Sequence, residues 1–463
     1  MSSSNHSDSV IKIAGGRVID PASGRDEVAD VWIDGGAIVD GPIDDDREFE
    51  TIDAGGLIVA PGLVDLMTEL REPGFEEDET IQRGGAAALA GGYTTILAAG
   101  NTDPCTDSPG AVEFLRQKAL AAGGPRVLVV GCVSKDRAGD QMAEIGLLVG
   151  AGAVALSDSP RPIANSALLK RALEYCRMFD LTIFNRPGVP ELSRGGVMHD
   201  GRVALVLGLK GLPTEAEDLG VARDVRLAEE TGGRLHVGPI SAMGAVDLMS
   251  KVKSRGVRVT VSVCPHNLCG GADGGGGGDG DGGDGGGGDG DGVGGDGVGK
   301  LSLSDGRLRS FDSRFKVHPP LRSGKHIAVL RDAVAAGEID AIQSGHMPRA
   351  REKKMNDLDQ SPFGLSSLET AMATVATTMI GHRGFDWPDL VQLMSTGPAE
   401  IAGVDAGTLA VGAAADVVLI DPAAQWTVDP GEFASLCVST PLEGERLRGR
   451  VVRTLVGGEV RFG

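Results

Sequence analysis

Histidine and carboxylate side chains are the groups in this chain that could hold a hydrolytic metal ion. Such a site needs nitrogen or oxygen ligands close together, with one coordination position left for water. None of the eight histidines forms an HxH or HExxH motif, the spacings that place two ligands on one face. The histidines are His6, His199, His236, His266, His318, His326, His346 and His382. The sequence also contains no GxSxG motif and no Cys–His pattern typical of a catalytic nucleophile.

Three of these histidines, His236, His266 and His346, lie at or just after apolar runs that we predict as neighbouring strands. Two interpretations are open for them. Three imidazoles from adjacent strand ends could hold a zinc ion. Alternatively, they are hydrogen-bonding histidines that belong to the fold, and this second interpretation is favoured.

The elements that must position these side chains alternate along the middle of the chain. Eight apolar runs predict strands, and most are separated by runs with apolar residues every three or four positions, which predict helices. The predicted strands are 62–67, 93–99, 126–131, 153–158, 181–186, 234–240, 257–263 and 339–345. Parallel strands joined by crossover helices favour a (β/α)8 TIM barrel, an α/β fold with its functional groups at the carboxyl ends of the strands. We assign the barrel to residues 61–402.

The two ends of the chain differ from the middle. Residues 1–60 and 403–463 consist of short apolar runs broken by Gly-rich turns, which predicts a small β-sandwich domain built from both termini. Residues 270–299 are almost entirely Gly and Asp. A calcium-binding β-roll would need an apolar residue in each repeat, and only Val293 and Val298 qualify, so a disordered insert is the favoured interpretation.

The chain resembles the bacterial-type dihydroorotases of the amidohydrolase superfamily over nearly its whole length outside the insert. The resemblance rests on PGLVDLMTELREPG (61–74), GNTDP (100–104), LGLKGLPTEAED (207–218), KVHPPLR (316–322) and SPFGLSSLET (361–370). It implies an amidohydrolase barrel in which zinc at the strand ends activates water to open a cyclic amide.

The chain departs from the dihydroorotase pattern at five strand ends. Where the resemblance implies metal ligands or the general base, this sequence has Met67, Glu69, Ser159, Arg186, Pro239 and Gly345. Met is a poor zinc ligand, Pro and Gly offer no side-chain ligand, and Arg brings a permanent positive charge. We therefore predict that the zinc is lost, that no cofactor is bound and that no catalytic residue remains.

Substrate-binding positions are better preserved than the metal ligands. The resemblance aligns Arg71 and Asn101 with residues that hold the substrate carboxylate, and it aligns His318 with an Asn. These residues could form a vestigial site for dihydroorotate or carbamoyl aspartate. The favoured alternative is that Arg71 pairs with Glu69 or Glu72 and that Asn101 caps a turn.

A further hypothesis concerns the charge of Arg186. We predict that it pairs with Glu69, Asp103 or Asp158 and so replaces the charge of the lost metal.

Composition narrows the class of partner. A net charge of −21 argues against nucleic acid, which needs a basic surface. No apolar run is long enough to cross a membrane, and the first residues do not read as a signal peptide. The six scattered cysteines are typical of reduced thiols, so we expect a cytoplasmic protein.

Three functional hypotheses follow. The first is a catalytically degenerate protein similar to the pseudo-dihydroorotases; the resemblance implies that these hold the aspartate transcarbamoylase catalytic subunit in an active hetero-oligomer. The second is a divergent, active dihydroorotase or cyclic amidohydrolase with a rebuilt or metal-free site. The third is a small-molecule sensor that uses Arg71 and Asn101. The first is favoured, and a hetero- or homo-oligomer is expected.

Overall fold

The computed structural model describes residues 10–41, 48–270 and 301–463. The predicted disordered insert at 270–299 lies outside the described residues except for Gly270.

Eight parallel strands form one sheet and follow one another in chain order. They are β6 (Leu63–Thr68), β7 (Tyr93–Ala98), β8 (Arg126–Gly131), β9 (Ala153–Leu156), β10 (Thr182–Asn185), β13 (Arg234–Val237), β14 (Val259–Val263) and β15 (Ala341–Ile342). Each strand coincides with one of the eight predicted apolar runs, so the prediction of a TIM-barrel-like fold is confirmed. The strands read as nearly continuous apolar segments because helices cover the outer face of the sheet.

The curled sheet closes between its first and last strands through polar contacts. The buried Asp65 carboxylate of β6 accepts hydrogen bonds from the backbone N–H of Ser344 at 2.7 Å and from its hydroxyl at 2.8 Å. The backbone N–H of Glu69 donates to the carbonyl of His346 at 3.2 Å. These contacts bring the ends of β6 and β15 to the same edge of the barrel.

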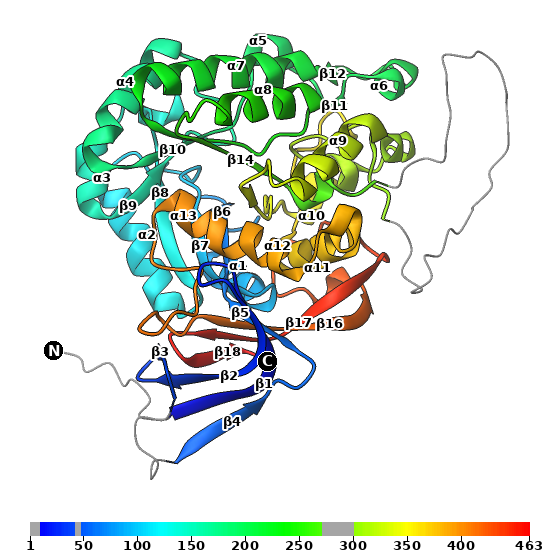
Figure 1. Ribbon diagram of the computed structural model, residues 1–463. Coiled ribbons are helices and arrows are strands. Elements are labelled where there is room, and N and C mark those ends of the chain that lie inside the picture. The colour runs from blue at the N-terminus through cyan, green and yellow to red at the C-terminus, as the bar shows by residue number, and fades with distance from the viewer. Residues whose placement is uncertain (1–9, 42–47, 271–300) are drawn as a thin grey trace, which may run out of the picture.

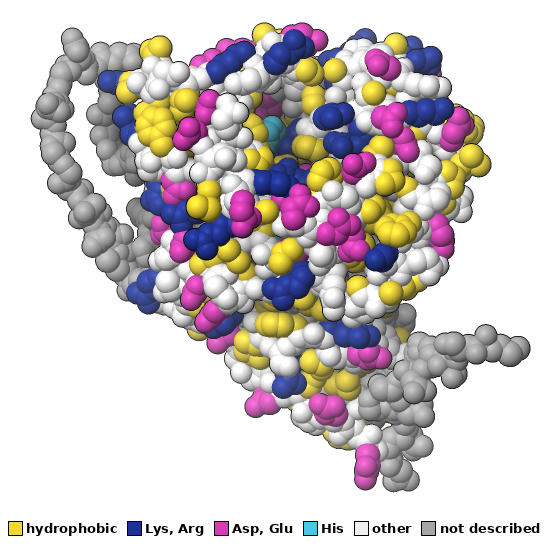
Figure 2. Space-filling model, turned by 180° about the vertical axis from the view of Figure 1, so that it is seen from behind, with side chains coloured by type: hydrophobic (Ala, Val, Ile, Leu, Met, Phe, Trp, Pro, Cys, Tyr) yellow, Lys and Arg dark blue, Asp and Glu magenta, His cyan; other side chains and the backbone are white. Residues whose placement is uncertain are grey.

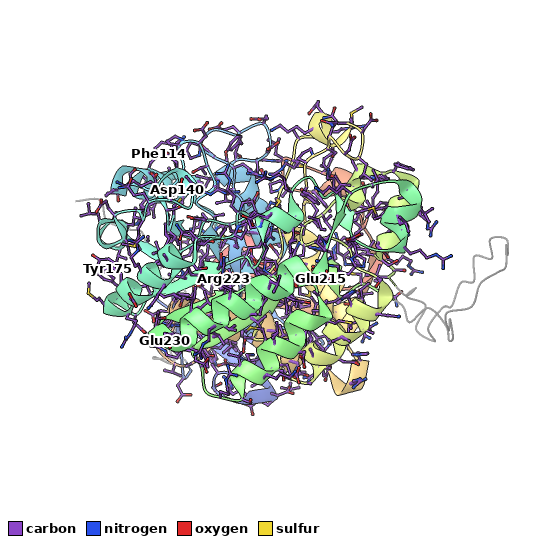
Figure 3. All side chains as sticks on the ribbon, turned by 90° about the horizontal axis from the view of Figure 1, so that it is seen from above. Phe114, Asp140, Tyr175, Glu215, Arg223 and Glu230 are labelled. Carbon is purple, nitrogen blue, oxygen red and sulfur yellow. The ribbon has the colours of Figure 1, made fainter. Side chains whose placement is uncertain are left out.

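Helices surround the sheet (Figure 1). Viewed from above, Glu215, Arg223 and Glu230 lie along one of these outer helices, α7 (Figure 3). The helices are α1 (Ile81–Ala90), α2 (Pro109–Ala122), α3 (Ile145–Ala151), α4 (Ser166–Cys176), α5 (Pro190–Ser193), α6 (Arg202–Leu207), α7 (Thr214–Thr231), α8 (Met243–Lys253), α9 (Gly324–Ala335), α10 (Arg351–Lys354), α11 (Leu368–Met379), α12 (Trp387–Val391) and α13 (Gly397–Ala402). Their Leu, Val and Ala side chains form one large core with the outward-facing residues of the strands.

The terminal segments build a second sheet beneath the barrel, where the blue and red ends of the chain lie together in Figure 1. Its order is β18-β17-β16-β5-β1-β2-β3, and β4 pairs with β1. The strands are β1 (Val10–Asp20), β2 (Arg25–Asp34), β3 (Ala37–Val39), β4 (Phe49–Asp53), β5 (Ile58–Pro61), β16 (Val417–Thr427), β17 (Arg446–Val456) and β18 (Glu459–Phe462). Because β5 pairs with β1 on one side and with β16 on the other, the prediction of one β domain from both termini is confirmed.

A loop of the C-terminal segment reaches back to the barrel. The hydroxyl of Ser435 donates to the buried Glu79 carboxylate at 2.5 Å, and the backbone N–H of Leu436 donates to the same carboxylate at 3.1 Å. The backbone N–H of Ala434 donates to Glu369 at 3.0 Å. These bonds fix the loop against α1 and α11.

Two general predictions can be compared with the described residues. All six cysteines are described and are free thiols, as predicted. Within the described ranges, no helix combines the length and the apolar character that crossing a membrane requires.

Candidate functional site at the barrel mouth

The six residues predicted to replace the metal centre meet at one place. Met67 on β6 and Glu69 after it, Ser159 after β9, Arg186 after β10, Pro239 after β13 and Gly345 after β15 all line a single cavity. Parallel strands bring their carboxyl ends to one edge of a barrel, so residues far apart in sequence become neighbours there. We call this place the barrel mouth.

The cavity at the barrel mouth is small. The space open to the centre of a water-sized sphere is about 20 Å³, and one water needs roughly 10–15 Å³ of such space. The remaining lining residues are Leu66, Ser157, Phe184, His236, Gly238, Gln343, His346 and Met347. The cavity therefore has room for one water or a monatomic ion, and not for a dihydroorotate-sized ring.

Hydrogen bonds around β10 hold Arg186 at the mouth. Its neighbour Asn185 donates to the buried Asp224 at 2.6 Å and accepts from the backbone N–H of Ile163 at 2.9 Å. Arg223 of α7 pairs with Asp224 at 2.6 Å and donates to the carbonyl of Ile163 at 2.8 Å. Burial raises the pKa of Asp224 to about 6 against the opposing effect of Arg223. This network ties the end of β10 to an outer helix and fixes the backbone that carries Arg186.

Arg186 is only 6% exposed. Its Nη2 donates to the carbonyl of His318 at 3.3 Å, whereas Nε and Nη1 have no hydrogen-bond partner among the described residues. Burial lowers its pKa, and the nearby Cys264, Glu69 and Glu217 oppose this effect. In the described part of the chain no carboxylate lies within ion-pair distance of Arg186.

The predicted ion pair of Arg186 with Glu69, Asp103 or Asp158 is therefore wrong. The Asp158 carboxylate instead accepts hydrogen bonds from the backbone N–H groups of Val133 and Ser134 at 2.9 and 3.1 Å. Glu69 pairs with Arg71 and Arg349 instead, and Asp103 is largely exposed in its loop.

Glu69 forms a buried ion-pair network with two arginines. Its Oε2 lies 2.6 Å from Nη2 of Arg71 and 3.3 Å from Nη1 of Arg349. The interpretation that Arg71 pairs with Glu69 is thereby confirmed. The contact of Arg349 with Glu69 was not predicted. A usable signal was present, because Arg349 ends the Ser344–Arg349 run, and this run follows the strand whose end meets that of the strand before Glu69.

The three histidines considered as zinc ligands have separate hydrogen-bond partners. His236 is held by the hydroxyls of Thr260 and Ser262, each at 2.9 Å. His346 accepts from the backbone N–H of Ser367 through Nδ1 at 3.2 Å, and His266 contacts the carbonyl of Pro319 through Nε2 at 3.2 Å. Burial lowers the pKa of His236 and His346 to about 3 and that of His266 to about 4. All three are neutral near pH 7, as the favoured interpretation requires.

The remaining predicted substrate contacts lie outside the lining of the mouth cavity. Asn101 is buried, and its Oδ1 has no hydrogen-bond partner among the described residues, so the predicted turn cap is not seen for that atom. His318 stacks edge-on against Phe363, with ring centroids 5.4 Å apart, and burial together with Arg186 lowers its pKa far below the usual range. Arg71, Asn101 and His318 do not line one cavity with the six residues of the mouth.

The zinc ion implied by the dihydroorotase resemblance does not fit the residues at the mouth. Zinc needs several His, Cys or carboxylate ligands around one point. Of such side chains, Glu69, His236 and His346 line the mouth beside the permanent cation Arg186. Two arginines engage Glu69, the hydroxyls of Thr260 and Ser262 hold both ring nitrogens of His236, and the ligand atoms of the three residues do not form a metal-binding group.

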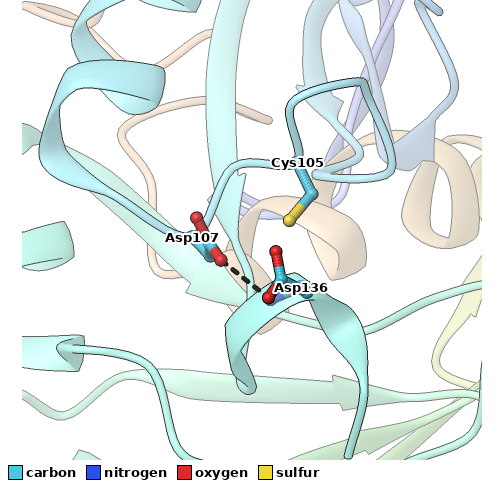
Figure 4. Close-up of side chains that lie close together, drawn as sticks. All are labelled: Cys105, Asp107 and Asp136. Atoms are coloured by element: carbon cyan, nitrogen blue, oxygen red, sulfur yellow. Dashed lines mark hydrogen bonds between the residues drawn. The ribbon is translucent and has the colours of Figure 1, made fainter.

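Over the described ranges, three His, Cys, Asp or Glu ligand atoms come together only in Cys105, Asp107 and Asp136. These residues lie on the loops after β7 and β8, where the Asp107 carboxylate accepts the backbone N–H of Asp136 at 2.8 Å (Figure 4). None of the three lines the barrel mouth.

A larger cavity of about 660 Å³ lies at the opposite end of the barrel. Its lining includes Thr182, Arg234 and Val259, the first residues of β10, β13 and β14. Chemistry in parallel barrels takes place at the carboxyl ends of the strands, so this cavity is not the equivalent of an active site.

Comparisons with known proteins agree with this fold. The Dihydro-orotase-like family model matches residues 56–244, and the Amidohydrolase family model matches residues 192–461. A putative dihydroorotase from Rhodopirellula baltica is 55% identical over 451 residues, which cover 97% of this chain and 92% of that protein. The chain belongs to the dihydroorotase-like amidohydrolases. A dihydroorotase from Anaeromyxobacter dehalogenans is also 41% identical over 453 residues, covering 97% of each chain.

Solved structures show that this dihydroorotase-like chain shares the amidohydrolase fold. An L-hydantoinase from Arthrobacter aurescens matches with a TM-score of 0.81 at 22% identity, over 98% of this chain and 96% of that one. A dihydropyrimidinase from Brevibacillus agri matches with a TM-score of 0.79, also at 22% identity.

Proposed function

We propose that this dihydroorotase-like protein does not hydrolyse dihydroorotate through a metal centre and instead serves as a structural and activating subunit for the aspartate transcarbamoylase catalytic subunit. The observation that carries the first half is the barrel mouth, where the six positions aligned with the metal centre line about 20 Å³ of space and none supplies a free metal ligand. Without metal ligands the site cannot lower the pKa of a bound water to the range needed for attack on an amide.

The second half of the proposal rests on the resemblance to pseudo-dihydroorotases that accompany aspartate transcarbamoylase. A buried core of this size is retained although the chemistry at the mouth is lost, which favours selection for the folded surface. Loss of catalysis and retention of the fold are both expected of a scaffold subunit.

Co-expression with the aspartate transcarbamoylase of the same genome tests the scaffold role. We expect the two chains to elute together in size-exclusion chromatography, and we expect the transcarbamoylase to lose activity when it is purified alone. An unrelated protein at equal concentration is the control. A transcarbamoylase that is equally active and identically assembled without this chain would contradict the proposal.

A second candidate is an active cyclic amide hydrolase of pyrimidine metabolism, favoured by the name dihydroorotase carried by a relative 41% identical to this chain. Metal analysis and a dihydroorotate hydrolysis assay separate the two candidates, with that relative as the positive control. The scaffold proposal predicts no stoichiometric zinc and hydrolysis at the uncatalysed background. Hydrolysis of dihydroorotate that is lost when a chelator is added would show that this chain is a metal-dependent hydrolase.

A further inference from the structure

Arg186 lacks the partners that a buried guanidinium normally has. The side chain is more than nine-tenths buried and lines the mouth cavity. Its single hydrogen bond, from Nη2 to the carbonyl of His318, leaves Nε and Nη1 without partners among the described residues. Buried charged groups are normally paired, since leaving one without a partner is strongly unfavourable.

The carboxylates closest to the mouth are engaged elsewhere. Glu69 contacts Arg71 and Arg349, so one negative charge already faces two positive ones. Asp158 accepts hydrogen bonds from Val133 and Ser134, outside ion-pair distance of Arg186.

Asp65 lies lower in the barrel, where it accepts bonds from Thr68 and Ser344, and burial raises its pKa. Glu79 lies 3.9 Å from Nε2 of His346, and burial raises the pKa of Glu79 as well. His236 and His346 are neutral near pH 7. Among the described residues none of these carboxylates forms an ion pair with Arg186, so no direct contact balances the charge of its guanidinium.

The space beside Arg186 limits what could balance this charge. A cavity of about 20 Å³ accepts a monatomic ion and excludes a sulfate, a phosphate or a ring. A water molecule could accept the two free N–H groups, but it would leave the charge uncompensated. Ser157 and Ser159 line the same cavity and bring hydroxyl groups to it. Figure 2 shows a hollow on the back of the barrel with a histidine inside it and with both basic and acidic side chains around it.

We propose that the barrel mouth is an anion site, which binds one small monovalent anion of halide size on Nε and Nη1 of Arg186. The mouth would then hold an anion beside Arg186 in place of the divalent cation that the dihydroorotase resemblance implies. This inference rests on the proposed loss of the metal centre. It names the ligand class that replaces the metal.

A crystal of the full chain soaked in sodium bromide tests the site directly. We expect an anomalous bromide peak in hydrogen-bond contact with the guanidinium of Arg186. Data collected at the zinc edge from the same crystals separate the two proposals. A zinc peak at the mouth would refute both the loss of the metal and the anion site. If the mouth shows no zinc peak and no bromide peak, only the anion site is refuted.

Thermal unfolding in solution provides the second measurement. The melting temperature is measured in sodium chloride and in sodium gluconate at equal ionic strength. Gluconate is the control because it is too large for the cavity. Above the dissociation constant, each tenfold rise in chloride should raise the melting temperature by about 1 °C for a chain of this length. Arg186→Met should abolish the difference between the two salts. Arg331→Met removes a half-buried guanidinium that does not line the mouth cavity, so this variant should keep the difference between the two salts.

A chloride response that persists in Arg186→Met would overturn the assignment to Arg186. If that variant does not fold, the bromide experiment on the natural chain still decides the question.

Discussion

The buried network of Glu69 with Arg71 and Arg349 predicts a large effect for one conservative change, Glu69→Gln. The carboxylate is 4% exposed on its side chain, and the two arginines are 6% and 13% exposed. Removing one partner of a buried ion pair costs about 3–5 kcal/mol, because it leaves uncompensated charge behind. Glutamine keeps the shape and one accepting oxygen, so we expect the lower end, about 3 kcal/mol.

Differential scanning calorimetry measures this loss. The entropy of unfolding for a chain of this length is about 1 kcal/mol per kelvin near the midpoint, so a loss of about 3 kcal/mol lowers the melting temperature by about 3 °C. Replacing Arg349 with Met in the same chain should restore part of the loss, since it removes one of the two unpaired charges.

An exposed ion pair provides the matched control. Asp247 and Lys251 lie 2.6 Å apart on α8 with side chains 61% and 68% exposed. Asp247→Asn should therefore cost at most about 0.5 kcal/mol, well under 1 °C. If Glu69→Gln and Asp247→Asn shift the melting temperature equally, the reasoning about the buried network is refuted.

Two further changes test other parts of the mouth. Gly345 has φ +71°, and an added Cβ would lie 2.9 Å from Sγ of Cys264. Gly345→Ala should therefore cost about 2–4 kcal/mol in urea unfolding, more than Gly337→Ala, where φ is +73° and the space is open; equal losses would contradict the crowding. The pKa of His236 is about 3 in the folded chain, below the unfolded value near 6.5, so protons favour the unfolded state and stability falls as the pH drops below about 6.5, by about 2 kcal/mol at pH 5. His236→Asn should show a shallower loss of stability between pH 7.5 and pH 5, and parallel curves would count against the buried neutral imidazole.

The barrel strands could be predicted from sequence because each is a short apolar run covered by helices. Helix α1 was missed because its sequence, IQRGGAAALA, contains two adjacent glycines, which are unfavourable inside a helix. Its small residues are needed for packing, since a Cβ on Gly84 would lie 2.7 Å from Leu70. Helix α3 was missed as well, and it has only seven residues.

The convergence of the site and the pairing of Arg71 with Glu69 were predictable, whereas the second arginine on Glu69 was not. Strand order alone brings Met67 and Gly345 to one cavity, because parallel strands end on the same side. Arg71 is only two residues from Glu69 and was predicted as its partner, although its positive φ of 65° was not. Arg349 lies 280 positions from Glu69, so only the folded barrel brings them together.

The loop that carries Ser435 has a consequence for the order of events during synthesis. Ser435 donates its hydrogen bond to Glu79 across 356 positions of sequence, and β5 needs β16 to complete its pairing. A ribosome adds about 5–20 residues per second, so the first barrel helix waits on the order of half a minute for its partner loop. During that interval the buried Glu79 carboxylate and one edge of β5 are without these partners. Partially synthesised chains should therefore be more dependent on chaperones than the size of either domain suggests.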